Sequence, residues 1–201
     1  MSNQSSHSHF LAQLARMKLI HRWPLMHNQQ LENIAEHSLM VAMMAHLLAV
    51  IENRLFDGDI DTGHVVLLAL YHDSSEVFTG DLPNPVKYAN TELRDAYKAL
   101  EVEAEHRLLT LLPEPLQADF TDLLISHHHL AHQQQIVKDA DILSAYIKCI
   151  EELKSGNQEF INAKRKLEQT LKERSRPPLD YMMDTFISSM GLSLDELSQF
   201  N

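Results

Sequence analysis

Apolar residues recur along most of the chain at intervals of three and four positions, which is the spacing of one face of an α-helix. Leu39, Met43, Leu47 and Val50 repeat in this way, and they predict a helix from residue 35 or 36 with these side chains turned inward. The 201 residues include only five glycines, and no run alternates convincingly between apolar and polar residues. The pattern therefore predicts an all-α fold.

Prolines, glycines and capping residues divide this pattern into segments. Trp23-Pro24 ends the first helix, because a residue before proline avoids the helical region, and Gly80 ends the third, because glycine tolerates a positive φ. The predicted helices cover residues 8–20, 35–55, 61–80, 91–112, 114–126, 135–155, 158–174 and 179–190, with a short one from residue 193. No linker-like composition separates them, so we expect one helical-bundle domain over residues 1–201, with residues 1–7 as a flexible N-terminus.

Charge and composition narrow the function classes. The formal net charge of -11 repels polyanions, which argues against extended binding to DNA or RNA. The longest apolar stretch, LMVAMMAHLLAVI, is interrupted by His46 and is too short and amphipathic to cross a bilayer. Cys149, the single cysteine, lies in a helical pattern that indicates a buried, reduced thiol. We therefore expect a cytoplasmic protein without a membrane partner or a secretory signal.

Candidate chemistry begins in the stretch LYHDSSEVFTGDLPNPVKY of residues 70–88. His72 and Asp73 stand side by side in an apolar helical pattern, where burial without a partner is unfavourable. A metal ion at the edge between them would satisfy both, because adjacent helical residues point about 100° apart. Glu76 lies one turn further on, where it could orient a water molecule or carry a proton.

Two ligands rarely hold a catalytic ion, so further donors are needed from other helices. His37, in NIAEHSLMVAMMAH, precedes an apolar continuation that would bury it, and Asp141, in IVKDADILSAYIKCI, has apolar neighbours. Two imidazoles and two carboxylates offset the charge of a divalent cation and leave positions for water and substrate. The lack of thiolates argues against a structural zinc site, whereas Mn²⁺, Co²⁺, Fe²⁺, Ni²⁺ and catalytic Zn²⁺ stay open.

Five segments together resemble a known family. The strings LIHRWPLM, ENIAEHSLMVAMMAH, ALYHDSSEVFTGDLPNPVKY, VKDAD and YIKCIEEL resemble the small bacterial 5'-deoxynucleotidases of the HD-domain superfamily of metal-dependent phosphohydrolases. The resemblance covers nearly the whole chain after the first few residues. It implies an HD-domain bundle that hydrolyses 2'-deoxyribonucleoside 5'-monophosphates to deoxynucleoside and phosphate. It also implies a cytosolic homodimer with one divalent cation, preferably Co²⁺ or Mn²⁺, with Ni²⁺, Fe²⁺ and Zn²⁺ as alternatives.

The resemblance also implies roles for individual residues. The implied metal ligands are His37, His72, Asp73 and Asp141, the catalytic residues are Glu76 and Arg22, and the substrate-binding residues are Arg22, Trp23, His37, Asp81, Leu82, Pro83 and Asn84. Arg22 offers a planar fork to phosphate oxygens. Our hypothesis is that Trp23 fills the space of a 2'-hydroxyl and that Asp81 accepts a hydrogen bond from the 3'-hydroxyl. Asn84 stands where relatives carry Thr, which leaves its contact with phosphate or sugar open.

Two other functions compete with this one. Another HD phosphohydrolase would act on nucleoside triphosphates, cyclic nucleotides or alarmones, but a triphosphate site needs more cations and a binuclear site more histidines than the sequence clearly shows. A metal-binding module that has lost catalysis would have no need of Arg22 and Glu76.

Other polar residues have ordinary structural explanations. We expect Asp139 to face solvent, because it points away from Asp141, His46 to be a core or interface histidine, and Lys87 to be a solvated loop lysine. The SHHHLAH run of residues 126–132 predicts polar surface, with His127 as the member that could reach inward.

Overall fold

Helices α2 (Ile34–Leu55), α3 (Thr62–Tyr71) and α8 (Ala131–Lys154) form the centre of the molecule. The computed structural model describes residues 7–199, and within this range it contains no β-strand, only an isolated antiparallel bridge between His21 and Asn33. The predicted all-α fold is therefore confirmed. The expected flexible N-terminus lies, apart from residue 7, outside the described residues.

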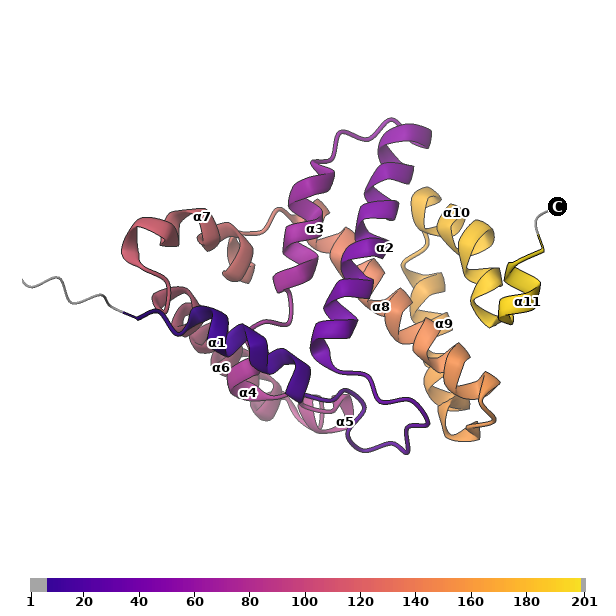
Figure 1. The fold of residues 1–201 in the computed structure, drawn as a ribbon, viewed down its shortest axis with the longest axis horizontal. Helices are drawn as coiled ribbons and strands as arrows, with labels where there is room; N and C mark the ends of the chain where they lie inside the picture. The colour runs from indigo at the N-terminus through magenta and orange to yellow at the C-terminus, as the bar shows by residue number, and fades with distance from the viewer. Residues whose placement is uncertain (1–6, 200–201) are drawn as a thin grey trace, which may run out of the picture.

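The remaining helices surround this centre (Figure 1). In chain order they are α1 (Phe10–Leu14), η1 (Ala15–Leu19), α4 (Glu76–Thr79), α5 (Asn84–Lys87), α6 (Thr91–Thr110), α7 (Glu114–Leu124), η2 (Ser126–His128), η3 (Gln158–Phe160), α9 (Ile161–Glu173), α10 (Pro177–Phe186), η4 (Ile187–Gly191) and α11 (Leu194–Leu197), where η denotes a 3₁₀ turn. In Figure 1, α1, α4, α5 and α6 gather at one side of the centre, and α10 and α11 lie at the opposite side.

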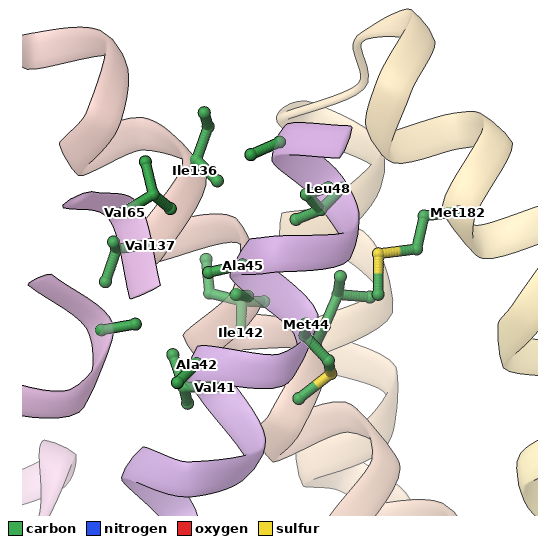
Figure 2. Close-up of a cluster of buried hydrophobic side chains, with 14 of the residues drawn as sticks. Val41, Ala42, Met44, Ala45, Leu48, Val65, Ile136, Val137, Ile142 and Met182 are labelled. Atoms are coloured by element: carbon green, nitrogen blue, oxygen red, sulfur yellow. The ribbon is translucent and has the colours of Figure 1, made fainter. Parts of the chain in front are cut away.

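Most of the core lies along α2, where this helix packs on α3, α8 and α10. Figure 2 shows its members, which include Val41, Ala42, Met44, Ala45 and Leu48 of α2, Val65 of α3, Ile136, Val137 and Ile142 of α8, and Met182 of α10. The small alanines of α2 let its two neighbours approach closely, and the burial of apolar surface here drives folding at about 25 cal/mol per Å². A smaller cluster of Phe10, Leu108, Leu112 and Leu124 joins α1 to the region of α6 and α7.

The buried face of α2 differs from the predicted one. Leu39 and Met43 are 49% and 56% exposed, and Leu47 and Val50 are only half-buried. The helix has a second apolar stripe, and that stripe packs on α3 and α8. The inward orientation predicted for Leu39 and Met43 is therefore wrong, because periodicity reveals a stripe but not which neighbour covers it.

The length of α2 bears on the membrane question. The helix has 22 residues and is long and apolar enough to cross a membrane by length and composition, so the sequence argument that its apolar stretch is too short does not hold. However, 56% of its most apolar window is buried inside the protein. Such burial is ordinary for a core helix of a globular domain.

The predicted helix over residues 61–80 is interrupted. Helix α3 ends at Tyr71, and residues 72–75 form turns before α4. The amide of Ser74 donates to the carbonyl of Tyr71 at 2.9 Å, and that of Glu76 donates to Asp73 at 3.1 Å, so the backbone follows a tighter i to i+3 pattern here. Gly80 has the expected positive φ, 71°. His72 and Asp73 therefore lie on a turn instead of a regular helix.

Asp139 does not face solvent. Its side chain is fully buried, and it accepts hydrogen bonds from Arg174 Nε at 2.6 Å and from Arg176 Nε at 2.8 Å. Arg176 also pairs with Glu52 of α2, which in turn lies 2.8 Å from His132 Nε2. The predicted exposure is wrong because the partners of Asp139 arrive from the segment that joins α9 to α10, more than 30 residues later.

Three further polar residues can be compared with the expectations. His127 is exposed, so it does not reach inward, and the half-buried histidine of its run is His129. His46 is exposed and is not a core residue of this chain. Lys87 is not freely solvated, since its Nζ lies 2.6 Å from Glu101 and 4.7 Å from the centre of the Tyr97 ring.

Replacing Asp139 by alanine should destabilise the fold by about 3 kcal/mol or more, because two arginines would lose their buried partner. Chemical denaturation measures this loss directly. The matched control is Asp184→Ala, whose side chain is exposed on α10, and it should change stability by less than about 0.5 kcal/mol. Similar values for the two variants would contradict the structural role of the Asp139 ion pairs.

Candidate metal and phosphate site

Four predicted ligands converge from three parts of the chain. His37 lies in the first turn of α2, where Asn33 and Glu36 form a capping box, His72 and Asp73 lie on the turn after α3, and Asp141 lies in the middle of α8. One ligand atom each from His37, His72 and Asp141 lies within 4.8 Å of the others. Asp73 lies beside this group, with its Oδ2 3.1 Å from His72 Nε2 and 3.6 Å from His37 Nε2.

The orientation of the two imidazoles leaves a specific deficit. His72 Nδ1 lies 2.7 Å from the carbonyl oxygen of Ala69, which requires a proton on Nδ1. In the neutral imidazole the lone pair of Nε2 then points toward Asp73. His37 Nδ1 lies 3.2 Å from Ser144 Oγ, and its Nε2 lies 3.2 Å from Asp141 Oδ1. Within residues 7–199, both Nε2 atoms are buried without a hydrogen-bond partner. A cation between the imidazoles and the carboxylates would satisfy them all.

The electrostatics of the ligands agree with this deficit. Burial alone would raise the pKa of Asp73, but the neighbouring His72 outweighs it and holds that pKa at about 2. Burial likewise opposes ionisation of Asp141, but its contacts with His37 and Lys138 hold the pKa of Asp141 well below its usual value. Both carboxylates therefore carry negative charge at neutral pH, as ligands of a divalent cation must.

Glu76 has a different environment from these ligands. Burial, and then the negative charges of Asp73 and Asp81, raise the pKa of Glu76 to about 10. Its Oε2 is buried and has no hydrogen-bond partner among residues 7–199. This environment favours the protonated form of Glu76, which is the form that can donate a proton.

Arg22 extends its guanidinium toward the ligands. Its Nη1 lies 3.4 Å from Asp73 Oδ2, and its Nη2 lies 4.0 Å from Asp141 Oδ1. Lys138 brings a second cation to the edge of the site, with its Nζ 2.7 Å from Asp141 Oδ2. A cationic fork next to a metal-ligating cluster is an arrangement that can bind a phosphate group.

The predicted loop follows Gly80. Burial raises the pKa of Asp81, whereas the positive charge of Arg22 opposes that rise. Leu82 and Pro83 are half-buried beside it, and Asn84 is exposed as the first residue of α5. The structure thus places Asp81 in the electrostatic field of the site, and it places Asn84 at the surface.

Sequence reasoning missed three residues of this site. Glu32 accepts hydrogen bonds from Arg22 Nε and Trp23 Nε1, both at 3.2 Å, and Ser144 and Lys138 support the ligands described above. Lys138 has a visible signal, since it stands three residues before Asp141 on one helix. Glu32 has none, because its partners depend on the path of the loop before α2.

Comparison with known proteins identifies the family. A family model described as 5'-deoxynucleotidase YfbR-like matches residues 9–190. The chain belongs to the YfbR-like 5'-deoxynucleotidase family. A relative from Cronobacter sakazakii named 5'-deoxynucleotidase is 54% identical, and the match covers 96% of this chain and 98% of that relative. The predicted family and the predicted reaction, hydrolysis of a phosphoric monoester, are thereby confirmed.

Solved structures confirm the HD-domain fold. An HD-domain phosphohydrolase from Listeria innocua superposes with a TM-score of 0.78 at 25% identity, over 90% of this chain and 87% of that one. An HD phosphohydrolase of cyanophage S-2L gives a TM-score of 0.61 at 18% identity, over 89% and 95% of the two chains. The latter structure contains dA and one catalytic Zn²⁺ ion.

Asp141→Asn should weaken Co²⁺ binding by at least about tenfold, because a ligand loses its charge within a buried set. Isothermal titration calorimetry with CoCl₂ measures this and needs no substrate. His127→Gln is the control, since His127 is an exposed histidine of the 126–132 run. Loss of cobalt binding in the control, with binding retained in Asp141→Asn, would show that the ion is held elsewhere.

Proposed function

We propose that this chain uses one divalent cation, held by His37, His72, Asp73 and Asp141, to hydrolyse 2'-deoxyribonucleoside 5'-monophosphates to deoxynucleoside and phosphate. One observation carries the proposal. Two imidazole Nε2 atoms that have no hydrogen-bond partner among residues 7–199 lie next to two ionised carboxylates and Arg22. Membership of the 5'-deoxynucleotidase family supplies the reaction.

The donor set fits a divalent cation. Two neutral imidazoles and two carboxylates balance its charge, and the mixture of nitrogen and oxygen donors suits Co²⁺, Mn²⁺, Ni²⁺, Fe²⁺ or Zn²⁺. We favour Co²⁺ or Mn²⁺. When bound, such a cation polarises a phosphoryl oxygen and lowers the pKa of a bound water, which supplies a nucleophile at neutral pH.

Arg22 and Glu76 would act on opposite ends of the reacting group. Arg22, whose Nη atoms point at the ligand carboxylates, would hold two phosphate oxygens and offset their charge in the transition state. As water adds to phosphorus, the bond from phosphorus to the 5'-oxygen breaks. Glu76 would donate its proton to that leaving oxygen, since burial raises its pKa and favours the protonated form.

The sugar would lie between Trp23 and the loop after Gly80. Trp23 has a φ of 59° and packs against Phe160 with 5.3 Å between ring centres, so it is a stiff wall where a 2'-hydroxyl would need space. Asp81 would accept a hydrogen bond from the 3'-hydroxyl, and His37, Leu82, Pro83 and Asn84 would complete the substrate contacts.

Phosphate release from a panel of dNMPs, NMPs and dNTPs tests the proposal. With Mn²⁺ or Co²⁺ we expect dNMPs to react at least about tenfold faster than NMPs, because a wall at the 2'-position excludes the extra hydroxyl. EDTA should abolish release. Equal rates on NMPs would remove the deoxyribose selectivity, preference for dNTPs would favour another HD phosphohydrolase, and no metal-dependent release would favour a non-catalytic metal-binding module.

We also propose that the protein is a cytoplasmic homodimer. Leu39, Met40 and Met43 expose 49%, 40% and 56% of their surface in a row along α2. Such a stripe can pair with its own copy about a two-fold axis, which would bury it. The negative net charge supports a small-molecule substrate over a nucleic-acid polymer, and the buried thiol of Cys149 fits a reducing compartment.

Met43→Glu should convert the dimer into a monomer, because it places a charge in the middle of the proposed interface. Light scattering coupled to size-exclusion chromatography measures the mass in solution. Leu116→Glu is the matched control, since Leu116 is similarly exposed on α7. Dimers that persist in Met43→Glu would locate the interface on another surface, and a monomeric parent protein would reject the dimer altogether.

A further inference from the structure

Glu32 joins two residues that otherwise have separate tasks. Its Oε2 accepts hydrogen bonds from Arg22 Nε and from the indole Nε1 of Trp23, each at 3.2 Å. The carboxylate is 15% exposed, and its Oε1 lies 3.9 Å from His37 Nδ1. A single oxygen atom therefore fixes the orientation of the guanidinium and of the indole ring together.

The backbone brings Glu32 opposite Arg22. The amide of Arg22 donates to the carbonyl of Glu32 at 2.9 Å, and the amide of Ile34 donates to the carbonyl of Ile20 at 3.0 Å. These bonds close the loop before α2 into a short antiparallel clasp. Because backbone hydrogen bonds fix residues 20–22 against residues 32–34, the Glu32 carboxylate already contacts Arg22 and Trp23 in the absence of substrate.

Trp23 needs such support. Its φ of 59° lies in the left-handed region, where the backbone of a bulky residue is strained. The bond to Glu32 and the contact with Phe160 hold its ring, whereas Asn28 Nδ2 and the amide of Met26, which donate to its carbonyl at 3.1 and 3.0 Å, hold its backbone. Loss of either ring contact would allow the ring to turn away from the position that the backbone presents.

The far side of the loop is tied to α8. Glu152, fully buried, accepts hydrogen bonds from the amides of Gln29 at 2.9 Å and Gln30 at 3.1 Å. Burial opposes the charge on Glu152, but hydrogen bonds, first from Lys148 and Asn157 and then from the two amides, lower its pKa to about 2. The loop is therefore fixed to the same helix that supplies Asp141, and Glu32 acts within a rigid frame.

We propose that Glu32 is a positioning residue that determines sugar specificity, by holding the phosphate-binding Arg22 and the sugar-facing Trp23 in one register. This inference rests on the proposed function, which assigns Arg22 to phosphate and Trp23 to the 2'-position. Deoxyribose selectivity and affinity for the phosphate group are then coupled through one carboxylate. Removing it should weaken both, because the Arg22 guanidinium loses the acceptor that fixes its Nε and the indole loses its only hydrogen-bond acceptor among the described residues.

The single tryptophan provides a readout that does not depend on activity. Trp23 is the sole tryptophan of the 201 residues, so intrinsic fluorescence and its quenching by acrylamide report on this side chain alone. In the absence of nucleotide, Glu32→Ala should increase the acrylamide quenching constant by about twofold or more. Glu32→Gln should keep the parent value, because its amide oxygen can still accept from both donors.

The kinetic part uses the same variants. With Mn²⁺, Glu32→Ala should lower the ratio of dAMP to AMP hydrolysis by about tenfold, the effect of one or two lost hydrogen bonds, and should raise KM for dAMP. Glu32→Gln should show the same dAMP to AMP ratio as the parent protein. Its KM for dAMP should lie between those of the parent and Glu32→Ala, because the negative charge opposite Arg22 is gone. Glu36→Ala is the matched control, since it makes the same change in the capping box four residues on and should leave quenching and ratio unchanged.

The outcomes separate this inference from the proposed function. Parent-like quenching in Glu32→Ala, or altered quenching with an unaltered ratio and KM, would overturn the role of Glu32. If Glu36→Ala changed quenching, ratio and KM as much as Glu32→Ala does, Glu32 would merely support the start of α2 and would have no specific role in positioning. If the parent protein did not discriminate dAMP from AMP, the proposed selectivity would fail and the specificity role with it, although quenching would still show whether Glu32 holds Trp23. Should Glu32→Ala not fold, Glu32→Asp, which is too short to reach both donors, should show the same losses against Glu32→Gln.

Discussion

The structure depends on an unmet electrostatic requirement at its centre. His72 uses the proton on Nδ1 to reach Ala69, so its Nε2 lone pair faces a carboxylate oxygen of Asp73 at 3.1 Å. Two acceptors at that distance repel each other unless a proton or a metal cation lies between them, and a metal cation also reaches His37 and Asp141. The fold brings His37 and Asp141 to the same point. Four side chains that would cost stability separately become a set of ligands when one divalent cation joins them.

The surrounding framework serves to hold these groups still. The break after α3 turns His72 and Asp73 toward each other, which a regular helix would not do. Helix α8 carries Asp141 and, three turns later, Glu152, so one proposed metal ligand and the attachment point of the loop before α2 lie on the same helix. Sites supported in this way keep the geometry that catalysis requires.

The sequence predicted which polar residues lie together better than it predicted what surrounds them. His37 and Asp141 could be selected from the sequence because a polar side chain within an apolar helical pattern is expected to have a buried partner. The orientation of Leu39 and Met43 could not, since α2 has two apolar stripes and only the packing of α3 and α8 decides between them. Asp139 was misplaced for a similar reason, because its arginines come from a distant segment. The contacts of Glu32 depend on how a loop folds back, which no local pattern encodes.

The most direct test of the central claim is a crystal structure with cobalt, in which anomalous scattering locates the ion. We expect a single cobalt bound by His37 Nε2, His72 Nε2 and the carboxylates of Asp73 and Asp141, each at about 2.0–2.2 Å. An ion at the exposed histidines of residues 126–132, with these four side chains left unligated, would contradict the account.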